Sequence, residues 1–180
     1  MNIRLASQLT IDSIVDGPGL RAVVWTQGCK HECRGCHNPH THDMNGGFEI
    51  DTNEIINQLK KLKLQKGITL SGGDPFEQSE AIMEIAAEAK NIGLDVWAYT
   101  GYTFEELTDI KNSNYFTNLM LLQNIDVLVD GRFIESKRDI NLKFRGSSNQ
   151  RIIDVAKTLK NKKVILHSQY IEQEQLDEAK

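Results

Sequence analysis

Short apolar runs alternate along this chain with segments whose apolar residues recur at helical spacing. Strands are expected at residues 22–25, 68–70, 95–99, 127–129 and 164–166, and helices near residues 52–64, 79–92, 103–110 and 152–159. Because strands that alternate with helices form right-handed βαβ units, the pattern predicts a parallel sheet. About five or six units are too few to close an eight-stranded barrel. We therefore expect an α/β fold, an open or partial (βα) barrel with about five or six parallel strands.

Two of the expected helices carry start signals. Asp51 precedes the first helix with an acid, Glu54, three residues later, and Thr103 with Glu106 repeats this capping-box pattern. Gly93 is a stop signal after the helix at residues 79–92. These signals support the division of the chain into alternating strands and helices.

Length and charge limit the classes of protein that this chain can belong to. A chain of 180 residues fits a single domain, residues 1–180. Its 21 Lys and Arg against 25 Asp and Glu include no long basic run, so we expect no nucleic-acid partner and no anionic membrane surface. The N-terminus lacks an apolar signal core, and no stretch approaches the roughly 20 apolar residues of a membrane span. We expect a cytoplasmic protein.

All three cysteines of the chain, Cys29, Cys33 and Cys36, lie within one short segment, the cysteine loop (residues 29–36). An odd number of cysteines in a reducing compartment makes a disulfide framework the poorest explanation. A four-iron cluster normally takes four thiolates, so three would leave one iron open to water, a non-cysteine ligand or a substrate. Two alternatives stay open. One is a set of unliganded thiols, and the other is a Cys3His zinc site that uses one of the nearby histidines, which would otherwise be polar loop residues or partner contacts: His31, His37, His40 and His42.

The loops that follow the predicted strands hold the other residues of interest. Ligands collect at the carboxyl ends of parallel strands, so residues 29–36, 72–74, 100–102 and 130–132 are expected at one rim of the sheet. Gly72 and Gly73 would leave room for a ligand against the backbone, and Asp74 offers a carboxylate to a cationic group.

The Cys-x3-Cys-x2-Cys spacing, followed by the Gly-Gly-Asp turn (residues 72–74), resembles the radical S-adenosylmethionine superfamily. Residues 16–19, 99–102, 126–131 and 145–150 are similar to the activating proteins of anaerobic ribonucleoside-triphosphate reductase. The resemblance implies a partial barrel of the radical S-adenosylmethionine type. It also implies a 4Fe-4S cluster on the three cysteines whose open iron binds S-adenosylmethionine. Reductive cleavage of that cofactor would then give a 5'-deoxyadenosyl radical.

The same resemblance implies the partners and the contacts of the site. The radical would remove a hydrogen atom from a backbone glycine of the large reductase subunit, with a flavodoxin-like protein as electron donor and no catalytic side chain beyond the cluster and the cofactor. Asp74 would bind the methionine amino group, and Arg132 the methionine carboxylate. The residues that the resemblance assigns to the cofactor are Gly35, Cys36, His37, Gly72, Gly73, Asp74, Thr100, Asp130 and Arg132.

Further residues of the rim have two interpretations each. Tyr99 and Tyr102 would face the ribose or the partner, or simply pack at a strand end. Asp130 and Arg132 would otherwise form a surface ion pair. Arg145, Ser147, Asn149 and Gln150 would contact adenosine or the partner, or satisfy their own loop. His167 is left outside the site, and the polar segment at residues 169–180 is expected to be a terminal helix or a frayed end.

Three other functions compete with this interpretation. An electron-transfer iron-sulfur protein normally surrounds its cluster with a full set of cysteines, and this chain is one short. A zinc-stabilised binding module has no need of the Gly-Gly-Asp turn. Within the enzyme class, the alternative is activation of a different glycyl-radical enzyme, such as pyruvate formate-lyase.

Overall fold

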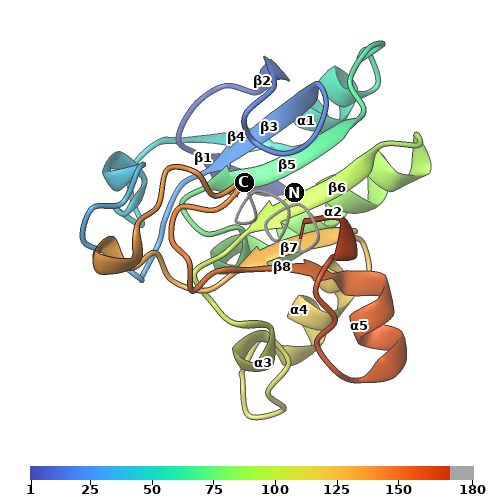
Figure 1. The fold of residues 1–180 in the computed structure, drawn as a ribbon. Coiled ribbons are helices and arrows are strands. Elements are labelled where there is room, and N and C mark those ends of the chain that lie inside the picture. The colour runs from blue at the N-terminus through green and yellow to red at the C-terminus, as the bar shows by residue number, and fades with distance from the viewer. Residues whose placement is uncertain (171–180) are drawn as a thin grey trace.

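The protein is an α/β structure built on one open, mixed sheet, as a computed structural model that describes residues 1–170 shows (Figure 1). The strand order is β4-β1-β3-β5-β6-β7-β8, and β2 pairs with β3 beside this path. The strands are β1 (Asn2–Leu5), β2 (Thr10–Ser13), β3 (Arg21–Thr26), β4 (Phe48–Asp51), β5 (Gly67–Gly72), β6 (Asp95–Tyr99), β7 (Val127–Asp130) and β8 (Arg151–Asp154).

The centre of the sheet is parallel and its edges are antiparallel. Within the described residues β3, β5, β6 and β7 pair in parallel, whereas β1, β2, β4 and β8 all pair antiparallel. The prediction of five or six parallel strands was therefore wrong in number, although the α/β class is confirmed. The N-terminal antiparallel strands β1, β2 and β4 are only four residues long, and β2 has a single buried residue, so they lack the continuous apolar run of a central strand.

The C-terminal end of the sheet also differs from the prediction. A helix was expected from about residue 152, but residues 151–154 form β8, antiparallel to β7. The helix begins only at Val155, because the Asp154 side chain accepts a hydrogen bond from the Lys157 N–H and caps it. The strand expected at residues 164–166 is reduced to one isolated bridge, Ile153 to Leu166.

The α-helices are α1 (Thr52–Leu59), α2 (Ser79–Asn91), α3 (Phe104–Leu107), α4 (Tyr115–Leu122) and α5 (Val155–Asn161), and the short 3-10 turns are η1 (Pro39–Thr41), η2 (Pro75–Gln78) and η3 (Glu135–Lys137). The capping box between Thr103 and Glu106 is confirmed at the start of α3. Helix α4 was not predicted. No helix within residues 1–170 is long and apolar enough to cross a membrane.

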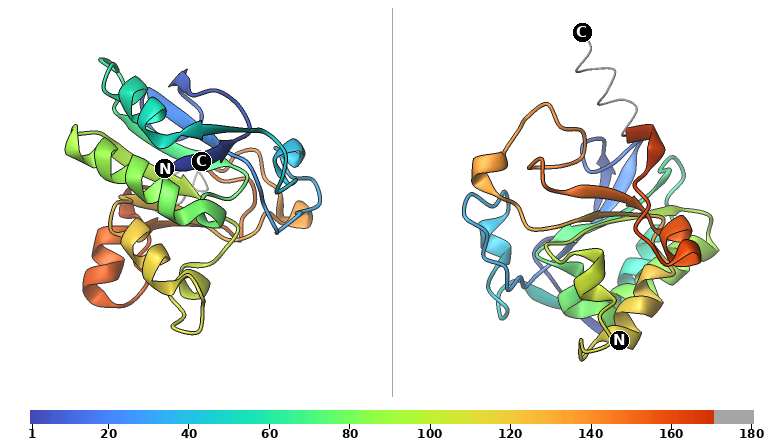
Figure 2. Two further views of the ribbon diagram at one scale, coloured as in Figure 1. Left: turned by 180° about the vertical axis from the view of Figure 1, so that it is seen from behind. Right: turned by 60° about the horizontal axis from the view of Figure 1, so that its bottom comes forward.

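Helices α1, α2 and α4 cover one face of the sheet, as the view from behind shows (Figure 2). Ile82 and Ile85 of α2 pack there into the main core with Val24 and Leu70. The opposite face carries a smaller cluster around Trp97, whose ring meets Phe144 and Tyr170. Figure 1 shows the loop after β3 (light blue) and the loop after β7 (orange) side by side at the same end of the sheet. The terminal segment predicted from residue 169 lies, for residues 171–180, outside the described residues.

Candidate functional site

A cavity of about 450 Å³ opens at the carboxyl ends of the four parallel strands. It is lined by the segment before β3, by the loops after β3, β5 and β7, and by the end of β6. The sequence had singled out part of each of these segments. The predicted site residues that it collects are Cys29, Cys33, Cys36, His37, Gly72, Gly73, Asp74, Tyr99, Thr100, Arg145 and Gln150. The predicted residues that do not line it are Gly35, Tyr102, Asp130, Arg132, Ser147 and Asn149.

The three cysteine sulfurs are free thiols, half-buried and each approached by backbone N–H groups. Burial raises the pKa of the Cys29 thiol to about 11. The N–H groups of His31 and Glu32 act in the opposite direction, because they favour the thiolate. Burial also raises the pKa of Cys33, against the N–H of Phe133. The Asn38 N–H lies 3.4 Å from the Cys36 sulfur. Negative charge on the sulfurs would therefore meet oriented N–H donors.

The cysteine loop is anchored to the segment that follows it. The Gly28 and Cys29 N–H groups donate to the carbonyls of Thr41 and His42, at 2.9 and 3.1 Å. Within the loop Glu32 has a φ of +46°, a left-handed conformation that costs a non-glycine residue roughly 1 kcal/mol or more. The anchors, rather than local preference, hold this backbone in place.

The Gly-Gly-Asp turn packs directly under the cysteine loop. Gly72 has a φ of +103°, and a Cβ there would lie 2.5 Å from the Thr26 carbonyl oxygen. A Cβ on Gly73 would lie 2.3 Å from the Gly28 carbonyl oxygen. These glycines line the cavity, but the contact that excludes a side chain is the backbone of the segment before the cysteine loop. The expectation that they leave room for a ligand stays a prediction.

Asp74 is a buried junction, with 1% of its surface exposed. Its carboxylate accepts hydrogen bonds from the Phe76 N–H (3.0 Å), the Thr100 hydroxyl (2.9 Å) and the Gly101 N–H (2.9 Å). His31 Nε2 lies 3.1 Å from the same carboxylate. The turn, the cysteine loop and the end of β6 therefore meet at one side chain.

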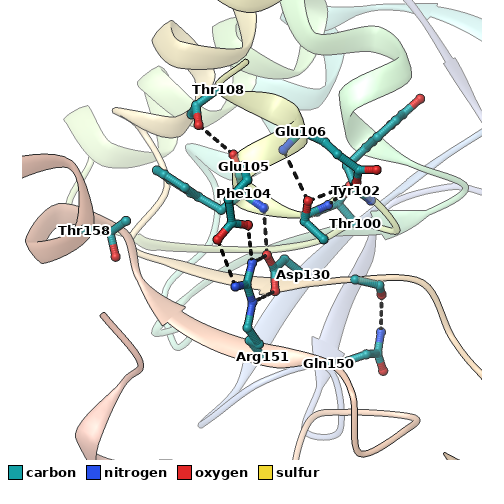
Figure 3. Close-up of polar contacts among 12 residues, drawn as sticks. Thr100, Tyr102, Phe104, Glu105, Glu106, Thr108, Asp130, Gln150, Arg151 and Thr158 are labelled. Atoms are coloured by element: carbon teal, nitrogen blue, oxygen red, sulfur yellow. Dashed lines mark hydrogen bonds and ion pairs between the residues drawn. The ribbon is translucent and has the colours of Figure 1, made fainter. Parts of the chain in front are cut away.

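Asp130 is equally buried but does not line the cavity. Its side chain points toward Arg151 and the start of α3 (Figure 3). Its carboxylate accepts from the Phe104 N–H at 2.7 Å and from Arg151 Nε at 2.9 Å, and Arg151 also reaches Glu105. The structure thus does not bring Asp130 into the cavity, because Arg151 and the start of α3 occupy its oxygens. Arg132 is exposed and also lies outside the cavity lining.

The loop at residues 145–150 is held by its own side chains. Gln150 accepts from the Gly146 N–H at 2.8 Å and donates to the Gly131 carbonyl at 3.0 Å. Arg145 Nη1 donates to the Gln150 carbonyl at 2.7 Å, and burial lowers the pKa of Arg145. The Ser147 hydroxyl accepts from the Ile134 N–H, which ties this loop to the one after β7.

Three residues of the rim were missed by sequence reasoning. His31 was expected to be a zinc ligand, a polar loop residue or a partner contact, yet its side chain is only 3% exposed and lies against Asp74. Phe133 lines the cavity, packs 5.4 Å from the His37 ring and would lie 3.3 Å from a Cβ on Gly35. Arg151 is the partner of Asp130. His31 had a usable signal, because a histidine between two closely spaced cysteines has little freedom to avoid the site.

These features define a class, an open α/β sheet with three thiols and a glycine turn around one cavity. The sequence model of the 4Fe-4S single cluster domain matches residues 15–153, which is most of the chain.

Curated relatives narrow the class. The anaerobic ribonucleoside-triphosphate reductase-activating protein of Vibrio cholerae is 37% identical over 147 residues, which cover 77% of this chain and 90% of that protein. The protein of that name from Escherichia coli (strain K12) is 37% identical over 147 residues, 76% of this chain and 90% of the relative. The one from Enterobacteria phage T4 is 34% identical over 145 residues, 77% and 86% of the two chains. The chain belongs to the family of anaerobic ribonucleoside-triphosphate reductase-activating proteins.

Proposed function

We propose that this protein activates an anaerobic ribonucleoside-triphosphate reductase by reductive cleavage of S-adenosylmethionine at a 4Fe-4S cluster. The observation that carries the proposal is the shared cavity, in which the three cysteines open beside the Gly-Gly-Asp turn at the carboxyl ends of the parallel strands. Cysteine ligands that number three, with no fourth in the chain, suit a cluster that keeps one iron for a second ligand.

The donor set fits a cluster better than a single zinc ion. A tetrahedral zinc with bonds of about 2.3 Å needs its thiolates within about 4 Å of one another. In residues 1–170 no three His, Cys, Asp or Glu side chains are grouped closely enough to hold one metal ion. A cluster spreads its ligands over separate irons, and the N–H groups near all three sulfurs complement the charge of bound thiolates. The cluster would be held by Cys29, Cys33 and Cys36.

The cavity also suits S-adenosylmethionine. Its volume of about 450 Å³ lies within the roughly 300–1,000 Å³ of small-molecule sites. Phe133 and His37 offer flat rings to an adenine, and stacking of a base on an aromatic ring contributes about 1–3 kcal/mol. When bound, the reduced cluster supplies the electron that breaks the sulfonium bond of the cofactor. The protein side chains orient the cofactor and keep water out of the cavity.

The finer fold, partner and setting are parts of the same proposal. The parallel strands β3, β5, β6 and β7 would correspond to the partial barrel of the radical S-adenosylmethionine superfamily. The substrate would be a backbone glycine of the large reductase subunit, with a flavodoxin-like electron donor in the cytoplasm. The relatives named above are activating proteins of this one reductase, which favours it over pyruvate formate-lyase as the partner.

Anaerobic electron paramagnetic resonance tests the proposal. The iron-reconstituted protein, reduced with dithionite, should give a reduced-cluster signal that changes when S-adenosylmethionine is added. Incubation with the reductase should then produce a glycyl radical signal. A cluster signal that ignores the cofactor would favour an electron carrier, and tightly held zinc without a cluster would favour a binding module.

A further inference from the structure

His31 connects the cysteine loop to the Gly-Gly-Asp turn through two different groups. Its backbone N–H is one of the groups that act to lower the pKa of the Cys29 thiol, two residues earlier in the chain. Its side chain contacts the turn, with Nε2 3.1 Å from an Asp74 oxygen. The two side chains are only 3% and 1% exposed, so water does not compete for this contact. Because an ionised carboxylate only accepts, Nε2 carries the proton of this hydrogen bond.

The acceptor positions of Asp74 are already filled. A carboxylate offers about four lone-pair positions. Asp74 meets four donors, which are the Phe76 N–H, the Thr100 hydroxyl, the Gly101 N–H and His31 Nε2. A cationic amino group could bind this carboxylate only if one of these donors left. The arrangement is therefore that of a fixed anchor rather than of an open anion.

The His31 ring has no freedom to leave. It packs edge-on against Tyr102, with ring centroids 4.4 Å apart. A Cβ on Gly101 would lie 2.3 Å from His31 Cδ2, so the backbone of the loop after β6 closes the other side. The neighbouring Lys30 also reaches this side, with Nζ 2.6 Å from Glu77, which in turn accepts from the Tyr102 hydroxyl.

We propose that His31 is a positioning residue that holds the cysteine loop on Asp74 and thereby keeps its own N–H directed at the Cys29 sulfur. Asp74 then serves the cluster through His31, instead of binding the methionine amino group directly. This inference rests on the proposed function for the cluster itself. Hydrogen bonds to cluster sulfurs stabilise the more negative, reduced state, so they raise the reduction potential. Loss of the His31 side chain should lower the potential.

Two variants and a control test this role. His31→Ala removes the donor to Asp74, His31→Gln keeps an N–H donor at the position of Nε2, and His40→Ala changes an exposed histidine of the same region. Two measurements are made, which are the midpoint potential of the reconstituted cluster and the amide hydrogen exchange of residues 29–36 in the cluster-free protein. His31→Ala should shift the potential to more negative values and speed exchange at least tenfold. His31→Gln should recover part of both effects, and His40→Ala should match the unsubstituted protein.

An unchanged potential and unchanged exchange in His31→Ala would overturn the inference. So would an Asp74→Asn protein that keeps the original potential and exchange but no longer binds S-adenosylhomocysteine, because Asp74 would then contact the ligand directly. Failure of the proposed function looks different. In that case the unsubstituted protein forms no cluster, or one indifferent to S-adenosylmethionine, while faster exchange in cluster-free His31→Ala still supports the role of His31.

Discussion

Asp74 and Asp130 are two buried carboxylates at the same rim of one sheet, and they serve different ends. Each is 1% exposed, and each lies at or just beyond the end of a parallel strand, β5 or β7. Both were expected to contact a cofactor. Asp74 lines the cavity, whereas Asp130 does not.

The partners of the two carboxylates explain the difference. Asp130 meets a fixed cation, Arg151 of β8, which also binds Glu105 through both of its terminal nitrogens (Figure 3). Asp74 meets backbone N–H groups, a hydroxyl and His31, all from loops that line the cavity or reach it. A buried carboxylate whose charge is compensated by a fixed arginine is part of the framework. Position at a strand end does not distinguish the two cases, but the partner does.

The largest expected effect is a loss of activity without a loss of stability, in a cysteine variant of the cavity that Asp74 lines. Cys33→Ala removes one of three cluster ligands, so cleavage of S-adenosylmethionine to 5'-deoxyadenosine should fall below detection. The urea midpoint of the cluster-free protein should stay close to that of the parent, since Cys33 is half-buried and lies in a loop. Anaerobic chromatography of the products and urea denaturation measure the two quantities. Full cleavage by this variant would show that the assignment of the cysteines as cluster ligands is wrong.

A loss of stability is expected when the cation beside Asp130 is removed. Arg151→Met leaves Asp130 buried without its cation, which should lower the free energy of unfolding by about 3–5 kcal/mol. Urea denaturation of the cluster-free protein measures this loss. Arg34→Met is the matched control, because Arg34 pairs with Glu135 at the surface with 92% of its side chain exposed, and such pairs contribute about 0–1 kcal/mol.

A second substitution sharpens that result. Adding Asp130→Asn to Arg151→Met removes the uncompensated charge, so part of the lost stability should return. The free energy of unfolding lost in the double variant is compared with the sum of the losses in the two single variants. If the two values are equal, Asp130 and Arg151 are not coupled, and the framework role of the pair is wrong.

Local patterns in the sequence were enough to predict part of the fold and part of the cavity. The expected strand at residues 95–99 coincides with β6, and the capping box at Thr103 is present. The cysteine spacing and the Gly-Gly-Asp turn led to the cavity, because strand ends in a parallel sheet share an edge. These features depend on residues that are neighbours in the chain.

The remaining features, around both carboxylates, required contacts between distant residues. Arg151 lies 21 residues from Asp130, and the two meet because β8 pairs antiparallel with β7 in a register that puts them opposite each other. The apolar spacing of Ile152 and Val155 suited a helix equally well, so the strand and its pairing were lost together. His31 and Asp74 are 43 residues apart, and nothing in either segment alone shows that they touch.

A smaller effect is expected from the hydroxyl beside Asp74. Thr100→Val keeps the shape of a side chain that is 5% exposed but removes a donor to a charged, buried acceptor. The free energy of unfolding should fall by about 2 kcal/mol, as for other hydrogen bonds to charged groups.

Thr108→Val is the matched control for this change. The Thr108 hydroxyl donates to the neutral Phe104 carbonyl at 2.8 Å, so its loss should cost about 1 kcal/mol. Equal losses in the two valine variants, measured by urea denaturation, would mean that Asp74 carries no special share of the stability of the rim.

The smallest effect concerns acid sensitivity on the Asp130 side. Hydrogen bonds from Arg151 lower the pKa of Glu105 in the folded protein. Between this lowered pKa and the ordinary glutamate value of about 4.3, the unfolded chain binds more protons than the folded one, so stability falls as the pH falls. The contribution is complete at neutral pH and is lost on acidification through the folded pKa. Its size is small, because the Glu105 side chain is 60% exposed and solvent screens the pair.

Glu105→Gln isolates that contribution from the other carboxylates. At neutral pH the variant should be slightly less stable than the parent, and the gap should close as the pH falls below about 4, where Glu105 of the parent also becomes neutral. Chemical denaturation at a series of pH values follows the difference. A gap that keeps its size in acid would show that Glu105 acts through packing, and Arg151 would then stabilise the rim through Asp130 alone.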